Sequence, residues 1–323
     1  MNKTWKFPAL LLDIDGLLLR GSNPIPRVLE TLAFLRKPIN VLYNNPALPN
    51  TQLPMVLFTN GGAALPPPKI ERFNNLFQLK DDYMKFDTRN IILNYSPLTE
   101  EADFDKEKLW LISGMWKICE IADFCGFKNT ITIKDFSKSL SFKNKDFNKV
   151  SGILFLDDLI EWDLNLNVII EILKNKSQNL PIVSVHADGF YPDAFPLPRM
   201  CLGIFIKLLR HFALKVLSKE PNLIYYGKPT IKAFEFAKKF VKQKWPELEI
   251  SNFYMLGDNP ETDILGGNRT NMKTILVKTG VYSEETKKNY AGKEELKPTY
   301  IQEDFYEAIR LISEIEGFIM KKL

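Results

Sequence analysis

One stretch, ALLLDIDGLLLR at residues 9–20, constrains the fold of this chain most strongly. Four apolar residues lead directly into Asp13 and Asp15, and Gly16 follows. A continuous apolar run that ends in acid is typical of a parallel strand buried on both faces, whose carboxyl end opens into a ligand-binding crevice. Because residues two apart in an extended chain point the same way, we expect both carboxylates to meet one ligand. A surface turn after the strand is the alternative if this pair is considered alone.

A second apolar run, PMVLFTN at residues 54–60, also ends in polar groups. Thr59 and Asn60 close it, and Gly61 and Gly62 follow. A hydroxyl, an amide and free backbone N–H groups at the carboxyl end of a strand suit an anion such as phosphate, so Thr59, Asn60 and Gly61 are candidate binding residues. An ordinary turn cap is the competing interpretation, and it is favoured if this stretch is considered alone.

Two later stretches place charge at the ends of predicted elements. YYGKPT puts Lys228 just before a predicted helix over 231–241. A cation is disfavoured there by the helix dipole unless an anion lies close by, so Lys228 is more informative than most lysines. NFYMLGDNPETD is an apolar strand that ends in Asp258, with Asp263 five residues later. The chain therefore has a second strand that finishes in carboxylates.

Together these groups make a coherent set for phosphoryl transfer. Mg²⁺, a hard cation that prefers oxygen ligands, would lie between Asp13 and Asp258 and bridge to the phosphate. Asp13 can attack phosphorus and form an aspartyl-phosphate. Asp15 can protonate the leaving oxygen and later deprotonate the attacking water. Lys228 and Thr59 would neutralise charge on the transferring group.

The sequence predicts two successions of strands and helices, one of which is inserted into the other. Residues 1–105 and 222–323 are predicted to form one doubly wound parallel sheet, and residues 106–221 an inserted α/β domain. Within the insertion we expect a polar loop at 136–148, and a helix at 203–216 that returns the chain to the first domain. The other elements expected there are strands at 109–114, 130–133, 152–156 and 181–185, and helices at 116–124 and 164–173.

Three further features have weaker interpretations. Residues 37–54 contain four prolines and are expected to be a long surface insertion without an assigned function. Asp157 and Asp158 follow a predicted strand but no glycine follows them, so a solvated strand end is expected. His186 and Asp188 either line a substrate pocket or hold a loop by hydrogen bonds.

Composition excludes several classes of function. A net charge of +4, without a long basic block, argues against a nucleic-acid partner. Three cysteines without paired spacing and two histidines argue against disulfides, a zinc site and a histidine-based triad. No apolar run reaches the ~18 residues that a membrane span needs, and no secretory or transit signal is recognisable, so a soluble cytoplasmic protein without a membrane partner is expected.

The polar stretches resemble the four motifs of the haloacid dehalogenase (HAD) superfamily, in order. They are DIDG at 13–16, TN at 59–60, GKP at 227–229 and GDNPETD at 257–263. The glycine after the second aspartate, TNGG and GDxxxTD resemble its class IIA branch, which contains phosphoglycolate, pyridoxal-phosphate, nitrophenyl-phosphate and nucleotide phosphatases. DIDGLLLRG, LDDLIEWDLNLNVI, FPLPRMCLG and YYGKPT resemble the mitochondrial-type group named after cat-eye-syndrome critical region five.

This resemblance implies a Rossmann-like core and a role for each motif residue. Asp13 would be the nucleophile and Mg²⁺ ligand, and Asp15 the general acid and base that also offers its backbone carbonyl to Mg²⁺. Asp258 would be a ligand, and Asp263 a ligand through water or a support for the other ligands. The residues that would hold the phosphate are Thr59, Asn60 and Lys228.

The resemblance also identifies residues 106–221 as a class IIA cap, which selects the leaving group. Cap-side specificity residues are hypothesised at Trp162, Asp188, Tyr191 and Arg199. This chain has Cys201–Leu202–Gly203 where the subgroup tends to have Gly-Gln-Gly, so the substrate is not transferred from relatives. Relatives are often dimers through the cap and one group is mitochondrial, which leaves a homodimer and a mitochondrial location open.

The leading prediction is a Mg²⁺-dependent phosphatase that acts on a small phosphorylated metabolite through an aspartyl-phosphate. A non-catalytic HAD-like metabolite-binding or scaffold protein is the alternative from a different class. The intact charges of Asp13, Asp15, Lys228 and Asp258 argue against it, because a scaffold has no need to keep mutually costly charges together. Phosphotransfer to an acceptor other than water is the third hypothesis.

Overall fold

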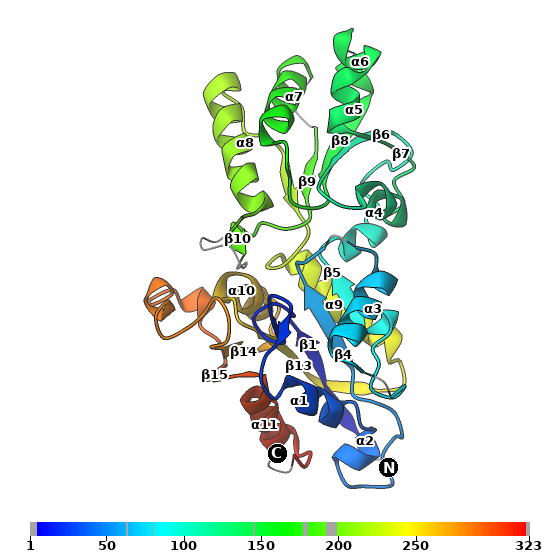
Figure 1. Ribbon diagram of the computed structural model, residues 1–323, viewed down its shortest axis with the longest axis vertical. Coiled ribbons are helices and arrows are strands. Elements are labelled where there is room, and N and C mark those ends of the chain that lie inside the picture. Colours follow the sequence, from blue (N-terminus) through cyan, green and yellow to red (C-terminus); the bar gives the residue numbers. More distant parts are fainter. Residues whose placement is uncertain are drawn as a thin grey trace. The chain divides into compact units, whose positions relative to one another are not determined.

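The computed structural model describes residues 5–62, 64–79, 81–144, 146–176, 180–191 and 199–320. The chain folds into two compact units, whose elements are labelled in Figure 1. The first unit comprises Met1–Thr59, Pro66–Ile92 and Lys228–Leu323, and the second comprises Asn60–Leu65 and Leu93–Gly227. Among the helices in these described ranges, none is both long and apolar enough to cross a membrane.

A six-stranded sheet in the order β15-β14-β13-β1-β4-β5 forms the centre of the first unit. The predicted strand of the opening motif is its β1, which pairs in parallel with β13 on one side and β4 on the other. Residues 7–12 of this strand are all buried, as expected for a strand covered on both faces. The strand bounds are Lys6–Leu12 (β1), Met55–Thr59 (β4), Ile91–Leu93 (β5), Glu249–Gly257 (β13), Lys273–Val277 (β14) and Tyr300–Gln302 (β15).

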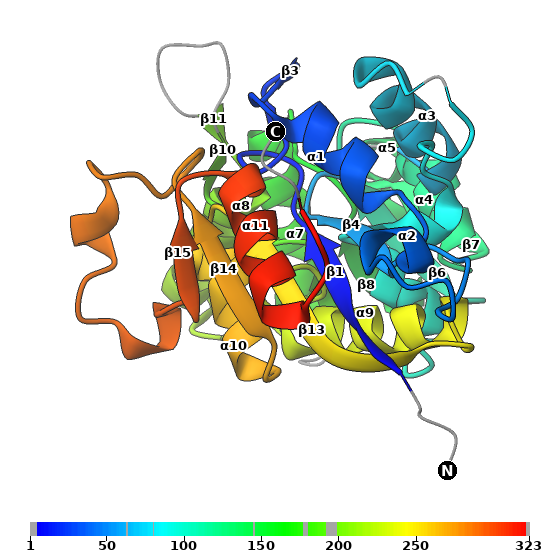
Figure 2. The ribbon, with the colours of Figure 1, turned by 90° about the horizontal axis from the view of Figure 1, so that it is seen from below.

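Helices cover both faces of this sheet. On one face, the hydroxyl of Tyr254 in β13 donates to Glu316 of α11 at 2.6 Å, and α1 packs beside α11 (Figure 2). On the other face, the rings of Phe58 in β4 and Phe234 in α9 lie 5.0 Å apart. The strand register places Tyr254 and Phe58 on opposite faces. The doubly wound core is therefore confirmed.

The remaining elements of the first unit connect these strands. A short hairpin follows the opening motif, and a π-helical turn, η4, follows β13. The helices are α1 (Val28–Leu35), α2 (Ile39–Leu42), α3 (Pro66–Leu76), α9 (Ile231–Lys244), α10 (Leu265–Arg269) and α11 (Phe305–Glu316). The hairpin and turns are β2 (Leu19–Arg20), β3 (Asn23–Pro24), η1 (Thr88–Asn90), η4 (Pro260–Ile264), η5 (Lys287–Asn289) and η6 (Glu294–Leu296).

A five-stranded sheet in the order β12-β9-β8-β6-β7 organises the second unit. Its pairings are parallel, and α7 and α8 pack together against its core (Figure 1). The strands are β6 (Leu109–Ser113), β7 (Asn129–Thr132), β8 (Val150–Phe155), β9 (Ile182–Ser184) and β12 (Leu223–Tyr225), with a separate pair β10 (Phe190–Tyr191) and β11 (Arg199–Met200). The helices are α4 (Ile118–Phe124), α5 (Ile133–Lys138), α6 (Leu140–Lys143), α7 (Trp162–Asn175) and α8 (Leu202–Leu217), and the 3₁₀ turns are η2 (Ser96–Glu100) and η3 (Phe147–Lys149).

One expectation for the insertion is wrong and another is confirmed. The segment expected to be a polar loop at 136–148 contains part of α5 and all of α6, because the hydroxyls of Thr132 and Ser139 accept from backbone N–H groups and cap these helices. The helix expected at 203–216 exists as α8, and its Phe205 and Leu209 are buried in the core of the second unit.

Two expectations about exposure are also corrected. Residues 37–54 form no unattached surface insertion, because Ile39 and Leu42 of α2 and the nearby Leu53 are buried. Asp157 is no solvated strand end, since only 8% of its surface is exposed. The FPLP part of the FPLPRMCLG stretch lies outside the described residues, and so does the side chain of Tyr191.

Candidate active site

The carboxyl ends of three neighbouring strands bring the predicted site residues of the first unit together. Asp13 directly follows β1, Asp258 directly follows β13, and Thr59 is the last residue of β4. These strands are adjacent and parallel, with β1 in the middle. Their ends therefore lie at the same edge of the sheet, which is where ligands bind in open α/β sheets.

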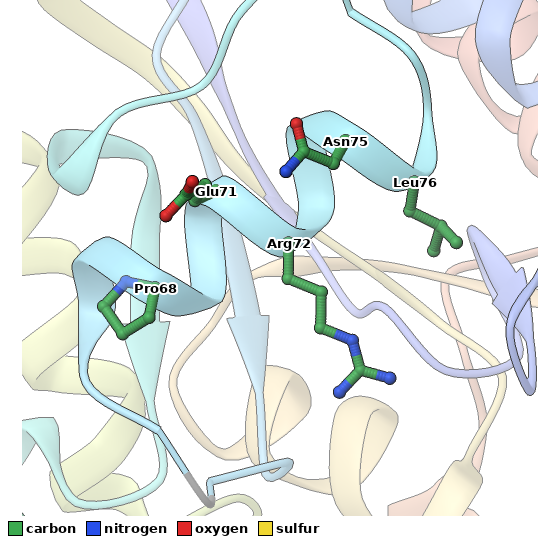
Figure 3. Close-up of a pocket in the computed structure, with 5 residues that line it drawn as sticks. All are labelled: Pro68, Glu71, Arg72, Asn75 and Leu76. Carbon is green, nitrogen blue, oxygen red and sulfur yellow. The ribbon is translucent and has the colours of Figure 1, made fainter.

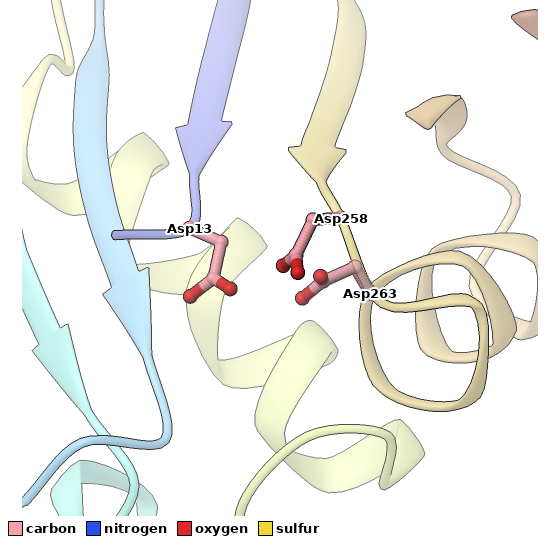
Figure 4. Close-up of side chains that lie close together, drawn as sticks. All are labelled: Asp13, Asp258 and Asp263. Atoms are coloured by element: carbon pink, nitrogen blue, oxygen red, sulfur yellow. The ribbon is translucent and has the colours of Figure 1, made fainter. Parts of the chain in front are cut away.

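Three carboxylates converge at this edge. One oxygen each from Asp13, Asp258 and Asp263 lies within 4.8 Å of the other two, and all three residues are buried. Figure 4 shows the three side chains pointing toward one another. Asp263 comes from η4, where the backbone N–H of Asn259 donates to its Oδ2 at 3.1 Å. The π-helical turn thus returns Asp263 to the end of β13.

Lys228 lies between two of these carboxylates. Its ammonium contacts Oδ1 of Asp13 at 2.8 Å and Oδ1 of Asp263 at 2.7 Å. The lysine is only 2% exposed, and Thr230 caps α9 two residues later by accepting from the N–H of Ala233. The two carboxylates supply the negative charge that a cation before a helix requires.

Burial and mutual repulsion raise the pKa of two of the carboxyls. For Asp258, burial and the charges of Asp13 and Asp263 raise the pKa well above its ordinary value. Burial also raises the pKa of Asp263, to about 7, although the charge of Lys228 opposes this. Burial disfavours the charge of Lys228 itself, but Asp13 and Asp263 outweigh it and raise the pKa of the ammonium. The cluster thus holds more negative charge than one ammonium can balance.

The donor set fits a divalent metal ion. With all three carboxyls ionised and Lys228 protonated, the cluster carries an excess of two negative charges. The atoms that it offers to a metal ion are carboxylate oxygens, the ligands that Mg²⁺ prefers. A bound divalent cation would balance the excess charge and remove the cause of the raised carboxyl pKa values.

Two glycines and a backbone amide fix the position of Asp258. A Cβ on Gly16 would lie 2.3 Å from Oδ2 of Asp258, and one on Gly280 would lie 1.9 Å from the same oxygen. The N–H of Val281 donates to that oxygen. Only glycine leaves room for this carboxylate, and Gly16 also adopts a φ of +91°. The supporting roles of Gly280 and Val281 were not predicted, because they lie in another loop.

We expect Gly16→Ala to raise the Mg²⁺ concentration needed for half-maximal activity by roughly tenfold or more, since supports of metal ligands carry effects of this size. The added methyl group would displace the Asp258 carboxylate. Gly21→Ala is the matched control, because Gly21 also has a positive φ, of +63°, but nothing within 4 Å of its Cβ position. Equal changes in both variants would assign the effect to backbone strain instead.

We expect the stability of the metal-free protein to fall as the pH rises from 3.8 toward about 7. Asp263 has a higher pKa folded than unfolded, so the folded chain binds more protons in this window and the free energy of unfolding decreases with pH. Mg²⁺ replaces those protons, so the rise in melting temperature on adding Mg²⁺ should be larger at about pH 8 than at about pH 5. Asp263→Asn should flatten the metal-free profile, and a Mg²⁺ effect independent of pH would contradict the assignment.

Asp15 lies beside this cluster. Its side chain reaches solvent, yet the surrounding protein desolvates the carboxyl, and this desolvation and the charge of Asp13 together raise its pKa. The charges of Lys69, Lys228 and Arg72 act in the opposite direction. Lys69 and Arg72 were not singled out from the sequence, where they are ordinary cations on a helix.

The other predicted phosphate-binding residues have different surroundings. Thr59 is buried at the end of β4, with 2% of its surface exposed. Asn60 and Gly61 belong to the second unit, where the side-chain amide of Asn60 donates to Oδ2 of Asp188 at 3.0 Å. His186 lies next to the same carboxylate, with its Nδ1 3.5 Å from Oδ2 of Asp188.

Comparison with protein families supports the motif assignment. A family model described as haloacid dehalogenase-like hydrolase matches residues 10–128, and one described as HAD-hydrolase-like matches residues 225–308. Asp13, Asp15 and Thr59 lie in the first match, and the later motif residues lie in the second. Membership of the narrower critical-region-five group stays a prediction.

Two yeast proteins are similar along almost all of this chain. The cardiolipin synthase (CMP-forming)/mitochondrial hydrolase fusion protein of Schizosaccharomyces pombe is 26% identical over 92% of this chain. A mitochondrial hydrolase of Saccharomyces cerevisiae is 25% identical over 95% of this chain and 95% of its own length. The chain spans only 51% of the fusion protein, so its likeness does not extend to that whole protein.

Solved structures share the fold. A possible sugar phosphatase of the HAD superfamily from Cytophaga hutchinsonii has a TM-score of 0.70 at 20% identity, over 93% of this chain and 94% of that one. A glycerol phosphate phosphatase from Mycobacterium tuberculosis, solved in complex with magnesium, has a TM-score of 0.64 at 16% identity, over 92% of this chain and 76% of that one. At these identities the likeness shows the fold alone, and it agrees with a Rossmann-like core that carries an inserted α/β domain.

Proposed function

Because this chain belongs to the haloacid dehalogenase-like hydrolases, enzymes that include phosphatases, we propose that it is a Mg²⁺-dependent phosphohydrolase acting on a small phosphorylated metabolite. The observation that supports this most directly is the buried cluster of Asp13, Asp258 and Asp263 with Lys228 bridging two of its members. Its excess negative charge matches one divalent cation. The synthase named in the fission-yeast fusion is a different activity and is not part of this proposal.

The proposed reaction has two displacements at phosphorus. A carboxylate oxygen of Asp13 attacks, an O–P bond forms, and the bond to the leaving oxygen breaks as that oxygen takes the proton of Asp15. Water then gives a proton to Asp15 and attacks the aspartyl-phosphate, which releases phosphate and restores Asp13. The raised pKa of Asp15 supports the first step, because this carboxyl must hold a proton to act as an acid.

Other residues would bind and orient the phosphate. Lys228 and Thr59 would offset its negative charge and hold it in line with Asp13, together with Asn60 and Gly61. Mg²⁺, when bound, would supply a positive charge that stabilises the transferring group. The residues that would hold the ion are Asp13, the backbone carbonyl of Asp15, Asp258 and, directly or through water, Asp263.

We further propose that residues 106–221 act as a class IIA cap that selects the leaving group. The independently packed second unit, with its own five-stranded sheet, supports a separate role for this insertion. Trp162, Asp188, Tyr191 and Arg199 stay candidate specificity residues. Two relatives named as mitochondrial support a mitochondrial location, while the cytoplasmic location and the homodimer stay predictions.

Phosphate release from a panel of phosphorylated metabolites and an aryl phosphate tests the proposal. We expect release that requires Mg²⁺ and disappears with a chelator. Added alcohols that compete with water would reveal transfer to another acceptor. Folded protein that binds Mg²⁺ but releases no phosphate from any compound would favour the binding-protein alternative.

A further inference from the structure

A hollow of about 490 Å³ lies on α3 (Figure 3). Its lining residues all belong to this one helix, and none of them is a predicted site residue; they are Pro68, Glu71, Arg72, Asn75 and Leu76. The contacts that lead to the predicted site are instead those of Asn60, which belongs to the second unit.

The side chain of Asn60 is held on two sides by other residues of the second unit. Its amide nitrogen donates to Oδ2 of Asp188 at 3.0 Å. On the other side lies Gly227, where a Cβ would come within 2.7 Å of Oδ1 of Asn60 and 2.2 Å of the backbone carbonyl oxygen of Val185. Only glycine leaves room for this close packing. The carboxamide of Asn60 is therefore fixed in position within the second unit.

The backbone of the turn that follows Thr59 is held as well. The side-chain amide of the buried Asn94 donates to the backbone carbonyl oxygen of Asn60 at 2.8 Å. A Cβ on Gly62 would lie 2.9 Å from Oδ1 of Asn94, so the turn packs closely against this side chain. Asn94 thus holds the backbone of Asn60, while Asp188 holds its side chain.

Asp188 itself is supported by α8. Its backbone carbonyl oxygen accepts from the N–H of Gly203 at 2.9 Å, and a Cβ on Gly203 would lie 2.5 Å from the same oxygen. The buried His186 places its Nδ1 3.5 Å from Oδ2 of Asp188 and its Nε2 3.7 Å from Oδ1 of Asp158. Asp158 in turn accepts from the N–H of Leu202 at 2.6 Å. The position of the Asp188 carboxylate is therefore set by a helix that is buried in the core of the second unit.

Asn60 and Gly227 are joined directly to two residues of the candidate active site. Thr59 precedes Asn60 in the chain, and Lys228 follows Gly227. In the proposed function, Thr59, Asn60 and Lys228 hold the transferring phosphate. A displacement of about 1 Å in a site of this kind can lower the rate roughly a hundredfold. A residue that fixes Asn60 can therefore affect phosphoryl transfer without touching the substrate.

We propose that Asp188 is a positioning residue for phosphoryl transfer, which holds Asn60 and the turn after Thr59 in the geometry that phosphate binding requires. This inference rests on the proposed function, and it gives Asp188 a role distinct from leaving-group specificity. The two roles have different consequences. A specificity residue changes the preference between leaving groups, whereas a positioning residue affects all phosphate esters to a similar extent.

Kinetics on several phosphate esters test this role. Asp188→Ala should lower kcat/KM about tenfold or more for an alkyl, an aryl and a sugar phosphate alike, because a hydrogen bond to a charged group is lost. Asp188→Asn should recover most of the activity, since its amide oxygen can still accept from Asn60. Asp123→Ala, which removes an exposed carboxylate of the second unit, is the matched control and should leave kcat/KM unchanged. A loss confined to one leaving group would overturn the positioning role.

A double-mutant cycle tests whether Asp188 acts through Asn60. In that case Asp188→Ala should have little further effect once Asn60 is replaced by alanine, so that Asn60→Ala and the double variant agree in kcat/KM within about twofold. Fully additive losses would show that Asp188 acts independently of Asn60 and would contradict the proposal. Asp188→Ser, whose hydroxyl is too short to reach Asn60, repeats both measurements if Asp188→Ala does not fold.

Binding of inorganic phosphate separates a failure of this inference from a failure of the proposed function. Calorimetry with Mg²⁺ present should show about tenfold or more weaker binding of phosphate by Asp188→Ala than by the wild type. Equal binding by the two proteins would refute the positioning role and leave the proposed function intact. A wild type that neither binds phosphate nor releases it from any ester would refute both.

Discussion

Asp13→Asn is expected to lower kcat by at least roughly 10⁴-fold, because it removes the nucleophile on which both chemical steps depend. The amide is nearly isosteric and can still accept a hydrogen bond from Lys228, which contacts Oδ1 of Asp13 at 2.8 Å. Binding of a phosphonate should therefore survive while turnover is lost. The measurement is phosphate release at saturating substrate and Mg²⁺.

A trapping experiment makes this prediction specific to Asp13. With an aryl phosphate, whose leaving group needs little protonation, Asp15→Asn should accumulate a phosphorylated protein because its base for hydrolysis is missing. The label should be released by hydroxylamine, as an acyl phosphate is, and should be absent from the Asp13→Asn/Asp15→Asn double variant. Asp82→Asn, an exposed carboxylate of the first unit, is the control and should retain full activity. Label on the double variant would place the nucleophile elsewhere.

Lys228→Met is expected to lower the free energy of unfolding of the metal-free protein by about 3–5 kcal/mol, the usual result of removing one partner from a buried ion pair. The ammonium contacts two buried carboxylates, and its removal leaves Asp13 and Asp263 without a cation. Unfolding by urea in the presence of a chelator measures this loss. Activity should fall as well, because the same ammonium would offset charge on the phosphate.

Two comparisons separate the electrostatic cause from lost packing. Mg²⁺ should restore part of the stability of Lys228→Met, and the added substitution Asp263→Asn should restore part of it without metal, because each removes uncompensated charge. Lys85→Met, which removes an exposed lysine paired with Asp82, should change stability by less than about 0.5 kcal/mol. A Lys228→Met protein as stable as the wild type would rule out the buried-charge explanation.

The sequence pattern predicted the structure correctly where all the residues concerned lie in one strand or helix. The apolar run before Asp13 and the one before Asp258 each predicted a buried parallel strand with acid at its carboxyl end, and both strands exist. The position of Lys228 before a helix pointed to a nearby anion for a reason of electrostatics alone. Pattern failed at 136–148, where polar composition suggested a loop but side-chain caps at Thr132 and Ser139 start two helices.

Contacts between different strands, helices and loops could not be predicted from the sequence pattern. The chain order of residues says nothing of whether β1 lies between β13 and β4, yet this arrangement brings Asp13 beside Asp258. Gly280 and Val281 support Asp258 from a loop that follows another strand.

The sequence alone therefore identified the chemical groups of the site and their order along the chain. It could do so because short apolar runs, glycines and charges impose local backbone preferences. Strand order and the bridge of Lys228 between Asp13 and Asp263 came only with the folded chain. They depend on burial of surfaces from residues far apart in sequence. That burial is a collective property of the packed core, and no local window of sequence contains it.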